Sequence, residues 1–201
     1  MIRLFDILFA LLMLAAAGLP MLLIAVAIVL HDGFPVIFRQ TRVGRGGDPF
    51  TIFKFRSMRK SGPESSSGEI VGQSLADKQK ARAAFQTTQV GDERITPVGR
   101  VIRKTHLDEL PQIFNVLRGD MSVVGVRPDT PAQEVDYDPA YWQTRHIYRP
   151  GITGPAQVGH TSGGIPQRCF HELTWLEGRS VKLYLLLLLR TVVKVGRRNS
   201  F

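Results

Sequence analysis

Two adjacent carboxylates, Asp108 and Glu109, stand in the most unusual stretch of the chain, Thr105-His106-Leu107-Asp108-Glu109-Leu110-Pro111. Neighbouring residues of a helix point about 100° apart, so the two carboxylates would face different targets. One could attack a substrate while the other holds a cation, and a helix N-terminus there would favour a phosphate. The same residues also fit a capping box, with Thr105 as the cap and Asp108 three residues later, and taken alone this is the stronger interpretation.

Two arginines lie in rigid settings that could aim a positive charge at phosphate oxygens. Arg127 and Arg149 are each followed directly by a proline, which fixes the local backbone. A guanidinium group held in this way can bind a phosphate through two parallel hydrogen bonds. The ordinary alternative for either arginine is a solvated position on the surface.

Several enzyme classes are excluded by the absence of their motifs. The histidines lack the spacing of a zinc-binding H-E-x-x-H, and the chain has neither a G-x-S-x-G elbow nor a Walker phosphate loop. Its one cysteine, Cys169, rules out an intramolecular disulfide and a multi-cysteine zinc site. Zinc hydrolases, P-loop NTPases and disulfide scaffolds are therefore excluded, and a reducing compartment such as a cytosol is favoured.

The chain carries a strong positive charge. Its 26 Lys and Arg residues against 17 Asp and Glu residues give a formal net charge of +9 over 201 residues. This excess indicates a polyanionic partner, which could be nucleic acid, the phosphates of a nucleotide or an anionic lipid surface. The length suffices for one domain with its own core.

The elements that position these side chains begin with a membrane segment. Residues 7–30 carry no formal charge. An unbroken helix of that length would reach about 36 Å, enough to cross a hydrocarbon core of about 30 Å. A signal peptide is disfavoured because the apolar run is too long for one and no A-x-A cleavage site follows it.

Pro20, with Gly18 just before it, predicts a bend in this segment, because proline removes an intrahelical hydrogen bond and clashes with the preceding turn. Divided there, neither half is long enough to span the core, which permits a re-entrant hairpin that enters and leaves by one face. The positive flanks agree with a hairpin, since Arg3 precedes the segment and several arginines follow it. A kinked helix that still spans the bilayer fits the spacing equally well.

Short elements are predicted after the membrane segment. Residues 36–39 and 50–55 predict a β-hairpin around a Gly-rich turn at residues 44–48. A plain turn is favoured over a phosphate cradle there because the full cradle spacing and a following helix are absent. Residues 61–68 predict a surface loop, and residues 74–85 predict a polar helix capped by its first serine.

Further helices are predicted around and after the carboxylates. Residues 99–104 have the basic character of a helix end, and residues 107–119 contain a second helix that Gly119 terminates. Residues 180–195 predict a C-terminal helix whose apolar run is too short to span a bilayer. Basic residues close this helix, which suits a position on an anionic leaflet, and a buried helix is the alternative. These basic residues are Lys194, Arg197 and Arg198.

At these residues the chain resembles the bacterial sugar transferases, also called monotopic phosphoglycosyl transferases. The likeness rests on blocks that occur in family order and cover nearly the whole chain. These blocks are Lys54-Phe55-Arg56-Ser57-Met58, Asp92-Glu93-Arg94-Ile95-Thr96, Leu107-Asp108-Glu109-Leu110-Pro111-Gln112, Phe114-Asn115-Val116-Leu117, Gly119-Asp120-Met121-Ser122, Arg127-Pro128 and Arg149-Pro150-Gly151-Ile152-Thr153-Gly154. The size is similar to that of the minimal catalytic form, without the transmembrane bundle of larger relatives.

The resemblance implies that a sugar phosphate passes from a UDP-sugar to a membrane-bound polyprenyl phosphate, with release of UMP. It implies that Asp108 is the nucleophile, forming an aspartyl phosphosugar intermediate, and that Glu109 holds Mg²⁺. Both roles suit the chemistry, because a carboxylate can act as a covalent nucleophile and Mg²⁺ prefers oxygen ligands. The candidates for holding the phosphates and the nucleotide are four arginines, Arg56, Arg103, Arg127 and Arg149.

The resemblance also implies a re-entrant membrane helix broken near a Ser-Pro pair. Here Leu19 stands where that serine is usual, while Pro20 is present. A serine hydroxyl could bond to a helical carbonyl and stabilise the bend. Two further departures are Gly159-His160, where Asn-Gly is usual, and Tyr184, where the C-terminal helix often carries an aspartate. The sequence leaves the choice of sugar open.

The sequence therefore predicts a mainly helical α+β membrane enzyme, with residues 1–33 as a re-entrant helix-hairpin and residues 34–201 as a cytoplasmic catalytic domain that contains a short β-hairpin and interfacial helices. It would act at the cytoplasmic face of the bacterial inner membrane and start a polysaccharide or glycoconjugate, while its oligomeric state stays open. A non-catalytic, membrane-tethered binder of nucleotide sugars is the alternative, disfavoured by the Asp108-Glu109 pair. A nucleic-acid-binding protein is disfavoured by the membrane segment and by the absence of a recognisable binding motif.

Overall fold

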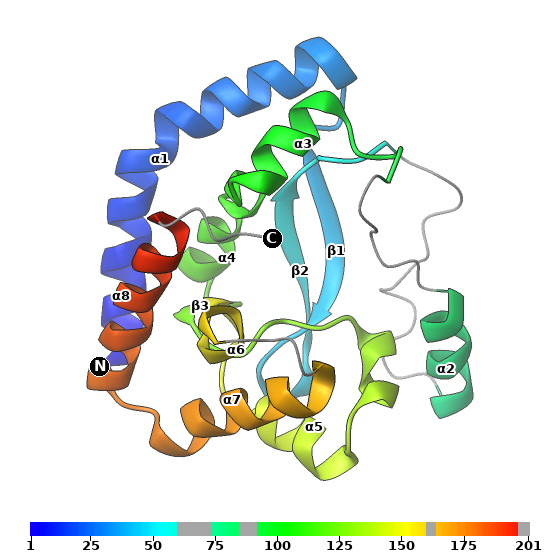
Figure 1. The fold of residues 1–201 in the computed structure, drawn as a ribbon, viewed down its shortest axis with the longest axis vertical. Coiled ribbons are helices and arrows are strands. Elements are labelled where there is room, and N and C mark those ends of the chain that lie inside the picture. Colours follow the sequence, from blue (N-terminus) through cyan, green and yellow to red (C-terminus); the bar gives the residue numbers. More distant parts are fainter. Residues whose placement is uncertain (60–73, 85–91, 160–163, 197–201) are drawn as a thin grey trace.

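The computed structural model describes residues 1–59, 74–84, 92–159 and 164–196. Within these ranges the chain is mainly helical and contains two small sheets (Figure 1). The helices are α1 (Ile2–Asp32), α2 (Leu75–Ala84), α3 (Pro97–Lys104), α4 (Gln112–Arg118), α5 (Pro139–Arg145), α6 (Pro155–Val158), α7 (Gly164–Gly178) and α8 (Val181–Gly196). The strands are β1 (Ile37–Val43), β2 (Pro49–Phe55), β3 (Ser122–Val124) and β4 (Gly151–Thr153). The loop predicted at residues 61–68 lies outside the described residues, as do His160, Arg197 and Arg198.

Helix α1 is continuous from Ile2 to Asp32, with Pro20 inside it. Figure 1 shows the helix changing direction partway along its length, as a proline within a helix predicts. The helix is long and apolar enough to cross a membrane, and few of its residues are buried in the protein. Ten of its large apolar side chains expose between 43% and 76% of their surface; they are Leu4, Leu8, Leu11, Leu12, Met13, Leu19, Leu22, Leu23, Val26 and Leu30. An apolar surface of this extent indicates contact with a membrane.

Both ends of α1 are attached to the same body of the protein. Near its start, the Arg3 guanidinium group donates hydrogen bonds of 2.7 and 3.2 Å to the last carbonyl groups of α4. The buried carboxylate of Asp6 accepts hydrogen bonds from β3 and from the Tyr184 hydroxyl group. At the far end, Arg56 donates to the carbonyl groups of residues 32–34. Both ends of the apolar helix are thus hydrogen-bonded to one folded unit.

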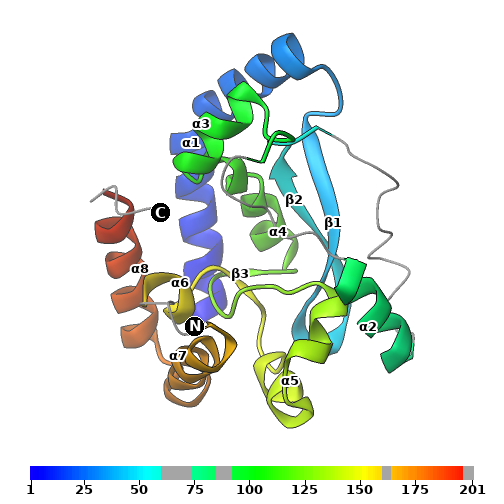
Figure 2. The same cartoon turned by 45° about the vertical axis from the view of Figure 1, so that its right-hand side comes forward.

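Helix α4 lies between α1 and the β-hairpin (Figures 1 and 2). Its Ile113 and Val116 pack in one buried cluster with Ala10 of α1 and Ile52 of β2. The second half of α1 contributes Ile28 to another cluster with β2 and α3. Burial of these side chains is the main favourable term that holds the three elements together.

The predicted β-hairpin is confirmed, and its first strand is longer than the sequence indicated. β1 pairs antiparallel with β2, with Phe38 opposite Lys54 and Arg42 opposite Phe50. The Gly-rich turn contains a short 3₁₀ segment, Arg45–Gly47, and is a plain turn. A second sheet joins β3 and β4 in parallel. The polar helix predicted at residues 74–85 is present as α2.

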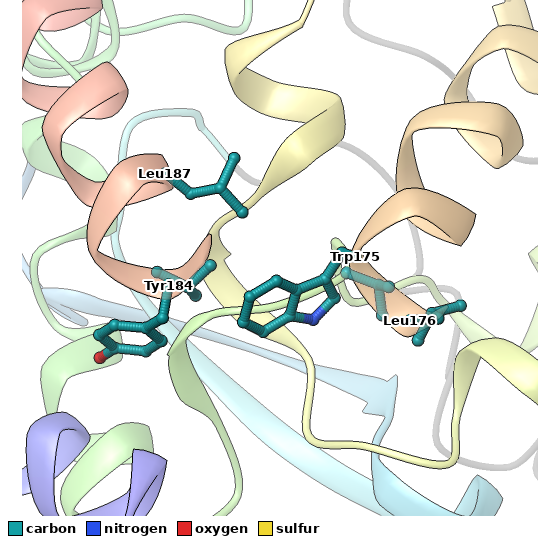
Figure 3. Packing of buried hydrophobic residues seen from close by; sticks show 6 residues of the cluster. Trp175, Leu176, Tyr184 and Leu187 are labelled. Atoms are coloured by element: carbon teal, nitrogen blue, oxygen red, sulfur yellow. The ribbon is translucent and has the colours of Figure 1, made fainter. Parts of the chain in front are cut away.

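The predicted C-terminal helix is also confirmed, as α8, and it packs back onto α7 and α1. Figure 3 shows Tyr184 and Leu187 of α8 beside Trp175 and Leu176 of α7. The hydroxyl group of Tyr184 points away from Trp175 and reaches Asp6. The opposite side of α8 exposes Leu189 and other apolar residues. One face of α8 is therefore buried and another is free to contact a membrane surface.

Candidate active site

The carboxylate pair lies in a tight turn, and the helix predicted at residues 107–119 begins later than expected. Asp108 and Glu109 belong to the 3₁₀ turn Leu107–Glu109, and α4 starts at Gln112. The Thr105 hydroxyl group donates to carbonyl groups of the preceding helix α3, so it ends that helix and caps nothing after it. His106 then adopts a left-handed conformation with φ 57°. The capping-box interpretation is therefore wrong, because the Thr105 side chain bonds back into α3 and the left-handed His106 separates it from the 3₁₀ turn.

Gly119 terminates α4 as predicted, with φ 96°. The start of α4 is fixed to β2 by a buried side chain that the sequence did not single out. The Asn115 amide accepts a 3.0 Å hydrogen bond from the Phe53 N–H and donates a 2.7 Å bond to the Thr51 carbonyl. The side chain thus supplies β2 with the bonds that a further strand would make. This contact holds the turn before α4 at a fixed position along β2.

Helix α3 closely approaches the segment just after β2 because it carries Gly99. A Cβ atom at this position would overlap the Ser57 backbone. The Thr96 side chain caps the helix by accepting a hydrogen bond from the Gly99 N–H, and the Thr96 N–H donates to the Ser57 carbonyl. The short connection from α3 to the 3₁₀ turn then places Arg103 near Asp108, where its charge lowers the pKa of that carboxyl group.

Glu109 forms an ion pair with Lys54 of β2. The Lys54 Nζ atom donates to Glu109 Oε1 at 2.5 Å, and both side chains are mostly buried. Burial alone would raise the pKa of Glu109, but the charges of Lys54 and Arg127 outweigh it and hold that pKa below its ordinary value. Burial also lowers the pKa of Lys54, which the negative charge of Glu109 partly offsets. Glu109 is therefore ionised at neutral pH.

Asp108 differs from its neighbour in its environment. It exposes 9% of its surface, and burial raises the pKa of its carboxyl group above the ordinary value. The positive charges of Lys54 and Arg103 act in the opposite direction, while Glu109 adds to the increase. A partly desolvated carboxylate next to cations has the character of a nucleophile toward an anionic phosphate.

The structure brings two of the four predicted arginines to the carboxylates. Arg103 and Arg127 both lie close enough to influence the pKa values of the pair. Arg149 instead donates to the Gly119 carbonyl at the other end of α4. Arg56 holds the end of α1 and lines a pocket of about 480 Å³ there. Sequence alone does not separate arginines that bind carbonyl groups from those that face a ligand.

The two carboxylates fit a magnesium ion that a substrate would help to bind. Glu109 uses only Oε1 for Lys54, which leaves Oε2 available. Mg²⁺ commonly takes one or two carboxylates together with substrate phosphates and water, so a larger set of protein ligands is not required. In the part of the chain that the structure describes, no group of three or more His, Cys, Asp or Glu side chains is arranged to hold a metal.

A buried ionic network lies beside the site and was not predicted from the sequence. Asp129 accepts hydrogen bonds from Arg145, Arg168 and Tyr137, and Glu172 accepts from both arginines as well. Both arginines also donate to the Arg127 carbonyl, at 3.0 and 3.1 Å. Arg168 and Glu172, four residues apart, were the only visible signal for this network in the sequence.

Comparison with known proteins places these residues in a family. Residues 1–198 match the description of the bacterial sugar transferases. The chain belongs to this family. It is 40% identical over 94% of its length to a UDP-glucose:undecaprenyl-phosphate glucose-1-phosphate transferase of Caulobacter vibrioides, of which it covers 67%.

Other sugar transferases have similar identity and carry other sugars in their names. The chain is 37% identical over 93% of its length to a UDP-N-acetylgalactosamine-undecaprenyl-phosphate N-acetylgalactosaminephosphotransferase of Aeromonas hydrophila, and covers 41% of it. It is 37% identical over 98% of its length to an undecaprenyl-phosphate galactose phosphotransferase of Salmonella typhimurium, and again covers 41%. The chain thus spans from under half to about two thirds of these relatives, and overall identity does not distinguish their sugars.

Proposed function

We propose that this sugar transferase moves a sugar 1-phosphate from a UDP-sugar to a polyprenyl phosphate such as undecaprenyl phosphate, and releases UMP. The observation that supports this function is that two adjacent carboxylates have different environments. Asp108 is largely desolvated, whereas Glu109 forms an ion pair with Lys54. Arg103 and Arg127 add positive charge where the diphosphate of the nucleotide sugar would lie. The names of the relatives support the same reaction class.

The reaction would proceed in two displacements at phosphorus. An Asp108 carboxylate oxygen attacks the sugar-bearing phosphorus, forming a P–O bond while the bond to UMP breaks. A phosphate oxygen of the polyprenyl phosphate then attacks the same phosphorus, and the bond to Asp108 breaks. The carboxylate is regenerated, and the lipid carries the sugar through a diphosphate. Burial of Asp108 supports this role, because desolvation strengthens both nucleophilicity and nearby electrostatic interactions.

Glu109 would hold Mg²⁺, which supplies charge neutralisation for the diphosphate and for departing UMP. Its low pKa keeps the carboxylate ionised across the working pH range. Lys54 shares the same carboxylate and orients it beside Asp108. The positive charges of Lys54 and Arg103 also reduce the repulsion between the Asp108 carboxylate and an anionic substrate.

We also propose that α1 enters the membrane and leaves it by the same face. An ordinary crossing would place the two ends of the helix on opposite sides of the bilayer. Arg3 and Asp6 at one end of α1 contact the folded unit, and Arg56 of that same unit contacts the carbonyl groups at the other end, which argues against that arrangement. The change of direction in α1, which contains Pro20, agrees with a shallow re-entrant helix. The catalytic domain would then lie on the cytoplasmic face of the inner membrane, with anionic lipids near α8.

The test is UMP release by the purified protein, with a panel of UDP-glucose, UDP-galactose, UDP-N-acetylglucosamine and UDP-N-acetylgalactosamine. We expect repeated turnover to require both polyprenyl phosphate and Mg²⁺, and we expect UMP release to be lost in Asp108→Asn. Product analysis should then identify a polyprenyl diphosphate sugar. Binding of nucleotide sugars without UMP release from any of them would support the alternative, a non-catalytic binding protein.

A further inference from the structure

Arg42 of β1 is a second arginine beside Arg127, and its surroundings differ from those of the structural arginines. One terminal nitrogen donates to the Pro128 carbonyl at 3.0 Å, and the other donates to the Gln40 side chain. The Nε atom is buried and has no hydrogen-bond partner among the described residues. Burial and the charge of Arg127 lower the pKa of Arg42 to about 10, so it remains charged at neutral pH.

No carboxylate is in direct contact with these two arginines in the described part of the chain. The nearby Asp129 attracts Arg42, but its oxygens bond to Arg145, Arg168 and Tyr137. Glu109 also attracts Arg42 from a distance, but its carboxylate forms its ion pair with Lys54. The Arg127 side chain is exposed and forms no hydrogen bond or ion pair with another described residue. Two neighbouring guanidinium groups therefore lack the anions that usually accompany them.

Hydrogen bonds to the backbone hold Arg42 close to the segment that carries Arg127. Consecutive groups of β1, the Arg42 side chain and the Val43 N–H, donate to the consecutive carbonyls of Pro128 and Asp129. From the other side, Arg145 and Arg168 of the buried ionic network donate to the Arg127 carbonyl. The segment that carries Arg127 is thus fixed to Arg42 at one side and to a rigid network at the other.

Keeping the buried guanidinium group of Arg42 close to a second positive charge is unfavourable unless an anion pairs with it. We propose that Arg42 and Arg127 together bind the diphosphate of the nucleotide sugar next to the Lys54–Glu109 pair. This inference rests on the proposed function and adds Arg42 to the residues that contact substrate. Two guanidinium groups from separate elements can each bind phosphate oxygens through paired hydrogen bonds, which orients the diphosphate for attack at one phosphorus.

The experiment measures UDP binding by the full-length protein in detergent, with Mg²⁺ present, for the unsubstituted chain and for Arg42→Gln, Arg42→Lys and Arg39→Gln. Arg39 lies on the same strand, is exposed and rests over the Phe53 ring, so it is the matched control. We expect Arg42→Gln to weaken UDP binding at least about tenfold, the scale of losing a charged hydrogen-bond partner. Arg42→Lys should lose less, and Arg39→Gln should stay within about twofold.

Two further readouts separate substrate contact from a structural role. The thermal midpoint without nucleotide should change little in Arg42→Gln, while the increase that UDP causes should shrink. The difference in affinity between the unsubstituted chain and Arg42→Gln should also narrow as the salt concentration rises, since it is electrostatic. A lower midpoint without nucleotide, together with a loss of affinity that salt does not alter, would make Arg42 structural and overturn the inference.

The inference and the proposed function fail differently. If the unsubstituted chain transfers sugar phosphate but Arg42→Gln binds UDP with unchanged affinity, the assignment of Arg42 is wrong and the proposed function stands. If the unsubstituted chain binds UDP through Arg42 but transfers no sugar phosphate from any UDP-sugar of the panel, the nucleotide site stands and the transferase assignment falls. Absence of UDP binding by the unsubstituted chain would overturn both.

Discussion

Lys54 of β2 donates to Glu109 of the 3₁₀ turn across a sequence separation of 55 residues. The contact joins the hairpin to the carboxylate pair and places one positive charge next to two negative ones. The same charge lowers the pKa of both Asp108 and Glu109. The ionisation of the proposed nucleophile is therefore coupled to a residue that does not itself react.

The pH dependence of the first half-reaction should report this coupling. Asp108 must be ionised to attack, and burial raises its pKa above the ordinary 3.8, so activity should be lost on acidification at a pH above that value. Lys54→Gln removes a charge that lowers this pKa, and the midpoint of the acid limb should move to higher pH. Single-turnover rates of UMP release measured across pH give the midpoint of the acid limb for the unsubstituted chain and for Lys54→Gln. A midpoint that is unchanged or lower in Lys54→Gln would contradict the coupling.

A covalent intermediate on Asp108 is the second prediction. With an accepted UDP-sugar, Mg²⁺ and no polyprenyl phosphate, the protein should release up to one UMP per active site and gain the mass of a phosphosugar. Intact-protein mass spectrometry after an acid quench measures the gain. Asp108→Asn should abolish it, because an amide of nearly the same shape is a far poorer nucleophile.

Steady-state kinetics distinguish this covalent mechanism from direct transfer. A covalent intermediate predicts ping-pong behaviour when both substrates are varied. Brisk lipid-dependent turnover with sequential kinetics and no mass gain would instead indicate direct transfer, with Asp108 acting as a general base.

Replacing Glu109 with Gln should weaken the response to Mg²⁺ and lower turnover at least about a hundredfold, the scale of losing one electrostatic stabiliser. The substitution keeps the size of the side chain and removes the charge that pairs with Lys54. Turnover measured against Mg²⁺ concentration tests this. Glu134→Gln is the control, because it removes a carboxylate from a salt bridge with Lys78 outside the site. If Glu109→Gln has the same Mg²⁺ response and the same turnover as the unsubstituted chain, Glu109 has a purely structural role.

The membrane arrangement can be tested by labelling two cysteines in a Cys169→Ser background. One cysteine is inserted directly after the exposed Met1, and the other replaces Asp48, which is exposed in the turn of the hairpin. Because both ends of α1 contact one folded unit, an impermeant thiol reagent should reach both sites from the same side of sealed vesicles. Labelling from opposite sides would establish an ordinary membrane crossing.

Local patterns were sufficient to predict several elements of this fold. The hairpin, the polar helix α2 and the C-terminal helix follow from turn residues, capping residues and apolar runs, and all three are present. The bend of α1 follows from Pro20. In each case, the determining residues lie within one or two turns of the feature that they specify.

Features that depend on contacts between distant residues were not predictable in this way. Helices α5 and α7 were missed, because much of what they bury is the ionic network of Arg145 and Glu172, which has no apolar periodicity. The 3₁₀ turn replaces a helix start because β2 fixes Asn115, 64 residues from its partner Thr51. For the same reason, the carbonyl partners of Arg56 and Arg149 were not visible in the sequence.

The bond between Asp6 and Tyr184 has a consequence for the order in which the molecule forms. The two residues are 178 positions apart, so α1 obtains this partner only after α8 has been synthesised. Arg3 likewise waits for α4, more than 110 residues later. The other hydrogen-bond donors to Asp6 lie in β3, which also follows α1 by more than 110 residues. Assembly of α1 onto the body is therefore a long-range step, and truncation before α8 would leave Asp6 with its β3 donors but without the Tyr184 hydroxyl group.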